Sequence, residues 1–257
     1  MPDDSRAAGG QEAALVVGDP REDAAPSPSG LLRREEPAPS SRRGFPPPTV
    51  DPTLSLSYPT AGRVREAAER FEYEIFRASG FCRPSRHERV EEYDEWAGQS
   101  RFAVVVDSGG GVVGATRILV GRYCDLPAGR LRGSTNDIGE PVLEVASIAI
   151  RPDHRSVGIA DRLYRAALAD SYRCRVKAIV MVVDPWLEDI LEDYYGVAPD
   201  CLGPRTRYMG GDVRPVAYRI PEHVNAFARA RPALWQFILD EFTPGEVADF
   251  DLPIVLP

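Results

Sequence analysis

Apolar and polar residues follow two different periods along the middle of the chain. Between residues 63 and 77, apolar side chains recur every three or four positions, which predicts an amphipathic helix. The runs SRFAVVVD and GVVGATRILV flank Ser108–Gly110, and this arrangement predicts a β-hairpin. After a loop over 121–141, the apolar run VLEVASIAI at 142–150 predicts another strand.

These patterns continue toward the C-terminal end. A helix is expected from about residue 160 to 173, and the run KAIVMVVD predicts a buried strand that is stopped by Pro185. The segment WLEDILEDYYG predicts a short helix that ends at Gly196. RYMGG and VRPVAYRI predict two short strands, and residues 221–242 predict one helix or two helices divided at Pro232. This order of elements indicates an α/β fold with mixed strand directions.

The composition of the two ends divides the chain into three parts. Residues 1–52 are rich in Pro, Ser, Gly, Ala and charged residues, so we expect a disordered tail, with docking through the polyproline segment GFPPPTV as the alternative. A folded domain is expected over 53–220, followed by a helical extension and tail over 221–257. The sequence begins without the features of a signal peptide, and no apolar run approaches the roughly 20 residues that cross a bilayer.

Charge and cysteine content narrow the function. The chain has 31 Lys and Arg against 39 Asp and Glu, and its net charge of −8 argues against a protein that binds nucleic acid by neutralising phosphates. Its four cysteines and three histidines show no zinc-site spacing, so we expect reduced thiols and no metal. These features predict a cytoplasmic protein without a membrane span, and they leave the oligomeric state open.

The segment Arg155-Ser156-Val157-Gly158-Ile159-Ala160 joins the predicted strand directly to the predicted helix. A glycine here permits a positive φ and a close approach by a ligand, so successive N–H groups can converge on an anion. The positive end of the helix dipole adds to the attraction. The segment is neither a Walker A loop nor a dinucleotide-binding fingerprint. The alternative is an ordinary turn between a strand and a helix.

The strand LEVASIAI, the elbow RPDHRSVGIA, the helix after it and the strand KAIVMVVD resemble the core of the GCN5-related N-acetyltransferase (GNAT) superfamily. The resemblance implies a mixed, mostly antiparallel central sheet with splayed central strands, flanked by helices. It implies that the elbow amides, from Arg155 through Ala160, hold the diphosphate of coenzyme A or the phosphopantetheine of an acyl carrier protein. The strand amides near Ile148 and Ile150 are then expected to bind the thioester carbonyl.

Other segments are similar to the acyl-homoserine-lactone synthases and N-acyl amino acid synthases of this superfamily. Glu91 and Asp94 match two positions of their acidic run, and Gly114 and Arg117 match their hairpin. The segment GPRTRYMGGDVRPV resembles their C-terminal motif. The chain departs from the lactone-synthase pattern at three positions: Glu72, Arg89 and Ser147.

Acyl transfer from a thioester to an amine needs a group that accepts the amine's proton, a site for the oxyanion and a departing thiolate. Glu144 is our candidate base, because a lone glutamate in an apolar strand is costly to bury without a purpose; an ion pair with an arginine is the alternative. We expect Tyr194 or Tyr195 to hydrogen-bond the departing sulfur, with plain packing as the alternative.

The acceptor is expected to lie against polar residues before and after the hairpin. Glu91, Asp94 and Arg117 suit the ammonium and carboxylate of an amino acid, or else they form a structural ion-pair network behind the hairpin. Ser147, on the central strand, joins the expected acceptor-binding set.

These features predict an N-acyltransferase. It moves an acyl group from acyl-CoA or an acyl carrier protein to the amine of an amino acid or similar small molecule, by direct attack in a ternary complex. Two alternatives stay open: a short-chain, acetyl-CoA-dependent N-acetyltransferase with a different acceptor, and a non-catalytic sensor of CoA or an acyl ligand. A deep apolar slot between the splayed strands would favour a long acyl chain.

Overall fold

The structure of the chain is a computed structural model that describes residues 51–131, 133, 138–154 and 158–254. Nearly all of the predicted tail therefore lies outside the described residues. The strands are β1 (Ser55–Ser57), β2 (Arg101–Val106), β3 (Val112–Gly121), β4 (Val142–Ile150), β5 (Ala178–Val183), β6 (Asp200–Cys201), β7 (Thr206–Tyr208) and β8 (Gly211–Arg219). The α-helices are α1 (Arg63–Ala78), α2 (Ile159–Arg173), α3 (Pro185–Tyr195), α4 (Glu222–Ala230), α5 (Pro232–Leu239) and α6 (Pro244–Asp249). Short 3-10 helices are η2 (Glu91–Trp96), η3 (Tyr123–Asp125), η4 (Ala128–Arg130) and η5 (Pro152–His154).

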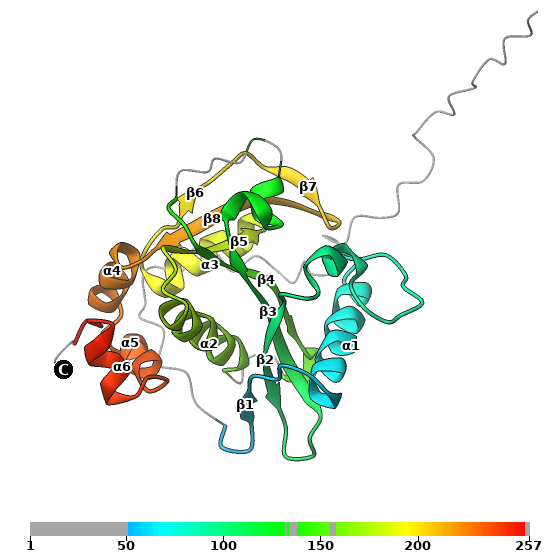
Figure 1. The fold of residues 1–257 in the computed structure, drawn as a ribbon, viewed down its shortest axis with the longest axis horizontal. Coiled ribbons are helices and arrows are strands. Elements are labelled where there is room, and N and C mark those ends of the chain that lie inside the picture. Colours follow the sequence, from blue (N-terminus) through cyan, green and yellow to red (C-terminus); the bar gives the residue numbers. More distant parts are fainter. Residues whose placement is uncertain (1–50, 132, 134–137, 155–157, 255–257) are drawn as a thin grey trace, which may run out of the picture.

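The central sheet is mixed and mostly antiparallel, as the sequence predicts. Its strands follow the order β1-β2-β3-β4-β5-β8-β6, and β7 pairs with β8 (Figure 1). Among the strands of the described residues, only β4 and β5 run parallel to each other. Their pairing extends from Val142–Ala178 to Val145–Met181, whereas β4 continues to Ile150. The two central strands therefore part beyond Val145.

An extra residue in β4 marks the place where the strands part. Arg117 of β3 pairs with Ser147 and the next residue pairs with Val145, so Ala146 has no partner in this register. Such a β-bulge breaks the alternation of side chains between the two faces of a sheet. As a result, Glu144 and Ser147 both contact residues on the α1 side, although they are three positions apart.

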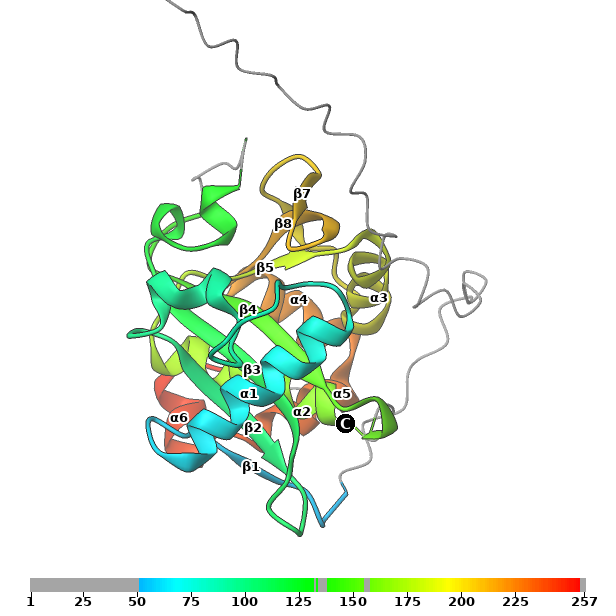
Figure 2. The ribbon, with the colours of Figure 1, turned by 90° about the vertical axis from the view of Figure 1, so that its right-hand side faces the viewer.

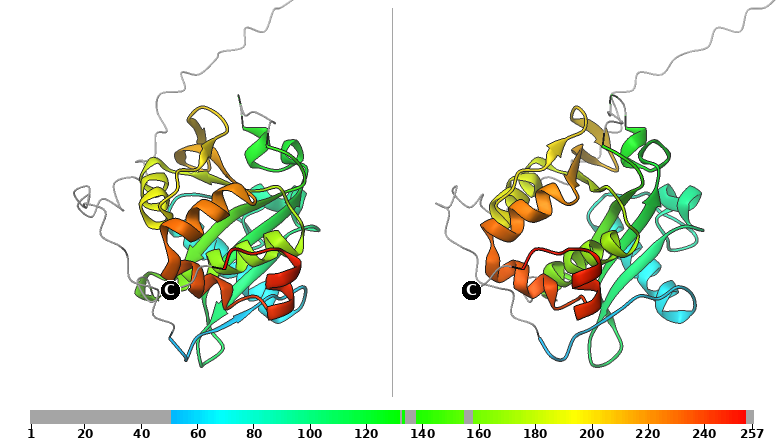
Figure 3. Two further views of the ribbon diagram at one scale, coloured as in Figure 1. Left: turned by 90° about the vertical axis from the view of Figure 1, so that its left-hand side faces the viewer. Right: turned by 60° about the vertical axis from the view of Figure 1, so that its left-hand side comes forward.

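Helices cover both faces of the sheet. Helix α1 crosses β2, β3 and β4 on one face (Figure 2), where Ala68 and Phe71 enter the core. Helix α2 covers the other face, and α4, α5 and α6 pack around it (Figure 3). The buried side chains accordingly form two clusters, one on each side of the sheet. None of the described helices is long and apolar enough to span a membrane.

Most predicted elements are present within a residue or two of their expected bounds. The C-terminal segment is two helices, because Pro232 begins α5 and cannot continue the hydrogen bonding of α4. Order starts earlier than the expected helix, since the three-residue β1 pairs with β2. The predicted loop over 121–141 contains η3 and η4, which lie above the central strands.

Candidate active site

The gap between β4 and β5 supplies an unpaired strand edge in the middle of the sheet. Antiparallel pairing with β3 uses only part of the peptide groups of β4, and the others point to the opposite edge. From Ala146 to Ile150, that edge has no partner on β5. Ile148 and Ile150, predicted to contribute thioester-binding amides, lie in this unpaired stretch and pair with β3 on their other side. A ligand in the gap can therefore hydrogen-bond to β4 as a neighbouring strand would.

Glu144 lies two residues before Ala146, where the gap begins, and is almost completely buried, with 1% of its surface exposed. The backbone N–H of Ala128 in η4 donates to both carboxylate oxygens, at 3.2 and 3.0 Å. Within the described part of the chain, no arginine pairs with it. Burial raises the pKa of Glu144 to about 8, and the hydrogen bond from Ala128 opposes this only in part. A buried carboxyl group that titrates near neutrality and adjoins the gap between two strands is suited to proton transfer.

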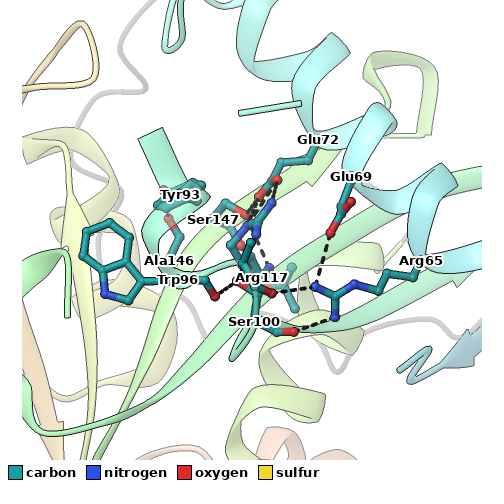
Figure 4. Close-up of polar contacts among 11 residues, drawn as sticks. Arg65, Glu69, Glu72, Tyr93, Trp96, Ser100, Arg117, Ala146 and Ser147 are labelled. Carbon is teal, nitrogen blue, oxygen red and sulfur yellow. Dashed lines mark hydrogen bonds and ion pairs between the residues drawn. The ribbon is translucent and has the colours of Figure 1, made fainter. Parts of the chain in front are cut away.

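A buried ion pair between Arg117 and Glu72 lies on the α1 face of the sheet (Figure 4). Nε and Nη2 of Arg117 donate to the carboxylate of Glu72, at 3.0 and 2.5 Å. Nη1 donates to the hydroxyl of Ser100 at 2.9 Å, and the hydroxyl of Ser147 donates to Glu72. Burial disfavours the charge on the guanidinium, but Glu72 outweighs this effect and raises the pKa of Arg117. The pair links α1 to the two strands behind the bulge.

Tyr93 of η2 holds the bulge from the same side. Its hydroxyl donates to the carbonyl oxygen of Ala146 at 2.5 Å, and its ring lies 4.9 Å from the guanidinium carbon of Arg117 (Figure 4). The carbonyl of Ala146 and the side chain of Ser147 are thus both fixed by neighbours on the α1 side. This network stabilises the bulge at the point where β4 leaves β5.

The expected acceptor-binding residues fall into two separate groups. Arg117 and Ser147 meet at Glu72 in the buried network. Glu91 and Asp94 lie in η2 with exposed side chains; Glu91 accepts from Ser85 and Asp94 pairs with Arg89. The structure does not bring these two acids to Arg117. Their predicted role in holding an acceptor stays a prediction.

The predicted diphosphate cradle is described from Gly158 onward, and Arg155, Ser156 and Val157 lie outside the described residues. Gly158 has a φ of 75° and precedes the first residue of α2, so its conformation is the one that favours glycine. As glycine, it offers no side chain to cap the helix. Ile159 is buried and Ala160 is half-buried.

The start of α2 packs very closely on the sheet. A Cβ atom on Gly114 of β3 would lie 2.3 Å from Cγ2 of Ile159. Gly114 is therefore the residue that admits the first turn of α2 to this position. Arg162, one turn further, donates to the backbone carbonyls of Leu54 and Asp51 and ties the segment before β1 to the helix.

Tyr194 and Tyr195 end α3 and face different neighbours. The hydroxyl of Tyr194 donates to Asp161 in the first turn of α2. Burial, and then this hydrogen bond, raises the pKa of Tyr194 far above its usual range, so the phenol keeps its proton. The ring of Tyr195 packs edge-on against Tyr164 and Tyr218. Tyr194 thus contacts the first turn of α2, next to the predicted cradle, whereas Tyr195 belongs to the wall of a partly open cavity.

That cavity lies on the α2 side of the sheet and has a volume of about 70 Å³. Val145 and Met181, the last paired residues before the gap, form part of its wall. The rest of the wall consists mainly of aliphatic and aromatic side chains from α2, β5, β8, α4 and α5. An apolar space therefore adjoins the gap on the face opposite Glu144.

Three of these residues were not foreseen as parts of the site. Glu72 follows Phe71 on the first helix, so its position next to the apolar face could have indicated a buried acid. Tyr93 lies within the acidic run, where an aromatic side chain between acids predicts burial. Ala128 acts through its backbone, for which no side-chain signal exists. Among the residues that the structure describes, no group of three His, Cys, Asp or Glu side chains gathers to hold a metal ion.

Comparisons with known proteins agree with this architecture. The model of the acetyltransferase (GNAT) family matches residues 68–195. No curated protein matches the sequence. Among solved structures, the fold is similar to FeeM, an N-acyl amino acid synthase from uncultured soil microbes, at 18% identity over 72% of this chain and 97% of that chain, with a TM-score of 0.51.

The fold is also similar to two acyl-homoserine-lactone synthases. BjaI, a CoA-dependent enzyme, is 15% identical over 76% of this chain and 85% of that chain, with a TM-score of 0.53. LasI is 12% identical over 71% and 94%, with a TM-score of 0.51. The family match covers the core from α1 to α3, including the strands that part and the helix that starts at Gly158. The chain therefore belongs to the acetyltransferase (GNAT) family and is an enzyme that transfers acyl groups.

Proposed function

We propose that the protein is an N-acyltransferase that moves an acyl group from a phosphopantetheine thioester to the amine of an amino acid or similar small molecule. The observation that carries the proposal is the position of Glu144. It is buried without a cationic partner among the described residues, has a pKa of about 8, and adjoins the gap between β4 and β5. A carboxyl group kept in this state gains nothing for stability, so a catalytic role explains it best.

The donor is acyl-CoA or an acylated carrier protein, whose thioester supplies an activated acyl carbon. The first turn of α2 suits its phosphate groups, because the helix dipole and the glycine-led start favour an anion. The unpaired edge of β4 near Ile148 and Ile150 suits its carbonyl oxygen. The acceptor reaches the same carbon from the opposite face of the sheet, on the side of Glu144.

The reaction then needs one proton acceptor and one hydrogen-bond donor from this chain. Glu144, in its charged form, takes a proton from the acceptor's ammonium group, and the free amine forms a bond to the acyl carbon. Peptide N–H groups of β4 stabilise the resulting oxyanion. The bond to sulfur breaks and Glu144 passes its proton on to the thiolate, while the second proton that the ammonium group must lose leaves the new amide nitrogen for solvent. The Tyr194 hydroxyl, once released from Asp161, offers the departing sulfur a hydrogen bond.

Two observations bear on the substrates. The apolar cavity beside the gap provides room beyond an acetyl group, which favours a longer acyl donor. The fold similarity to an N-acyl amino acid synthase supports an amino acid as the acceptor. A short-chain acetyltransferase is the second candidate. Glu144 has no arginine partner within the described ranges, and such an unpaired carboxyl group can serve as the base for a short acyl donor as well as for a long one.

Thiol release with a panel of acyl-CoAs, acyl carrier proteins and amino acids tests the proposal. We expect medium-chain donors to release thiol only when an amine is present, and Glu144→Gln to lower kcat at least about 100-fold while leaving the Kd for CoA unchanged. Glu74→Gln, an exposed change on α1, is the matched control and retains activity. If acetyl-CoA is the only donor that releases thiol in the presence of an amine, the second candidate is favoured. If no donor releases thiol, both candidates are refuted.

A further inference from the structure

One residue in the wall of the cavity on the α2 side carries an unsatisfied polar group. Tyr218 of β8 is part of its wall, and the Tyr218 hydroxyl is buried without a hydrogen-bond partner among the described residues. A buried hydroxyl left unpaired loses its hydrogen bonds to water without replacement, and a phenylalanine of the same shape would avoid this cost. Apart from His223, whose Nδ1 accepts from the backbone N–H of Arg219, the rest of the wall is aliphatic and aromatic. The tyrosine therefore fits a site that is completed by something bound in the cavity.

The position of Tyr218 relative to the gap indicates what enters. Val145 and Met181 form the part of the wall nearest the gap, because they are the last pair before β4 and β5 separate. Tyr218 pairs with Ile179, two residues deeper along β5, which corresponds to about 7 Å. A chain that enters from the gap passes Val145 and Met181 before it reaches the level of Tyr218.

We propose that this cavity receives the far part of the donor's acyl chain and that the Tyr218 hydroxyl hydrogen-bonds an oxygen carried by that chain. The substrate class is a medium-chain acyl thioester with a hydroxyl or oxo group, rather than a plain saturated one. This inference rests on the proposed function, because it assumes a thioester in the gap. At about 1.5 Å per bond, the oxygen lies roughly five or more carbon–carbon bonds beyond the Val145–Met181 level.

The size of the cavity agrees with a short terminal segment. Its volume of about 70 Å³ is near half of the roughly 150 Å³ that holds a benzene molecule in a protein core. A few carbon atoms and one oxygen fit without displacing the wall. Tyr164 and Tyr195 line the same space. The ring of Tyr195 lies between the rings of Tyr164 and Tyr218 and contacts both edge to face. These packed rings keep the hydroxyl of Tyr218 in one place.

Binding of acyl-CoAs by titration calorimetry tests the inference without turnover. The probes are decanoyl-CoA and a series of decanoyl-CoAs with one hydroxyl group at successive positions. We expect the protein to bind at least one hydroxylated probe about three- to tenfold more tightly than decanoyl-CoA, the range of one neutral hydrogen bond. Tyr218→Phe should abolish this preference and keep the affinity for decanoyl-CoA. Tyr172→Phe, which removes a phenol elsewhere on the α2 side, should retain the preference.

Two results overturn the inference. One is equal affinity for the plain chain and every hydroxylated chain. The other is a preference that Tyr218→Phe retains. Ligand-free stability gives an independent check, since Tyr218→Phe should unfold at the same or a higher urea concentration; a clear loss would mean that the hydroxyl already has a partner such as water. Failure of the proposed function is a separate outcome, in which the probes bind selectively but no amine is acylated.

Discussion

Glu144→Gln should change the pH dependence of stability in a direction opposite to that of most acidic residues. Burial raises the pKa of Glu144 from 4.5 to about 8, so the folded protein holds this proton over a range where the unfolded chain has released it. Below pH 4.5 both states are protonated and Glu144 costs nothing. As the pH rises from 4.5 to 8, stability is progressively lost, and above pH 8 the full cost of a buried charge is present.

The size of the effect follows from that interval. Each pH unit between the two pKa values lowers the free energy of unfolding by about 1.4 kcal/mol, so the loss is about 2 kcal/mol at pH 6 and on the order of 5 kcal/mol above pH 8. Full burial means that solvent does not screen the charge. Gln keeps the shape and an oxygen that accepts from Ala128, and it carries no charge at any pH.

Urea denaturation at pH 5, 6, 7 and 8.5 measures this directly. The free energy of unfolding of Glu144→Gln, relative to the native protein, should rise by several kcal/mol between pH 5 and pH 8.5. Glu74→Gln, an exposed change on α1, should show a constant difference. If the Glu144→Gln difference is also constant, the raised pKa is refuted, and with it the reason to choose Glu144 as the base. In the native enzyme, kcat/KM should rise through about pH 8 as Glu144 loses its proton, and the variant should lack this dependence.

Other substitutions test the neighbouring contacts. Glu72→Gln leaves the buried Arg117 guanidinium without its anionic partner and should lower the free energy of unfolding, measured with urea, by about 3–5 kcal/mol. Asp94→Asn breaks an exposed ion pair with Arg89 and should lower it by less than about 1 kcal/mol. Equal losses would contradict a dominant buried pair. Gly114→Ala forces a methyl group against Ile159, so it should cost about 1–3 kcal/mol and weaken CoA binding. Gly98→Ala, where the new methyl group meets open space, should leave both properties unchanged.

The fold could largely be predicted because its core elements carry strong periodic signals. The strand at 142–150 is apolar at seven of its nine positions, and Gly196 ends α3 in the left-handed conformation that its position predicts. The three-residue β1 is too short to show a period of two. Helix α6 could have been predicted from the sequence, since Thr243 and Glu246 form a capping box at its start.

The sequence indicates candidate site residues only where one residue carries the signal by itself. Glu144 stands out as a lone acid in an apolar strand, and Gly158 precedes a helix. The partner of Arg117 could not be predicted, because Glu72 lies 45 positions away and only the packing of α1 on β3 brings the two together. The bulge at Ala146 is likewise a property of the register between β3 and β4, which side-chain patterns do not specify.

The central claim is that a thioester lies in the gap between β4 and β5, with its phosphate groups at the start of α2 and its carbonyl beside Glu144. A crystal structure with a non-hydrolysable decanoyl-CoA analogue tests it most directly. We predict that the diphosphate meets the backbone N–H groups around Gly158, that the carbonyl meets the free edge of β4 between Ala146 and Ile150, and that the alkyl end enters the cavity lined by Tyr218. An analogue bound outside the gap, with β4 and β5 closed on each other, would contradict the account.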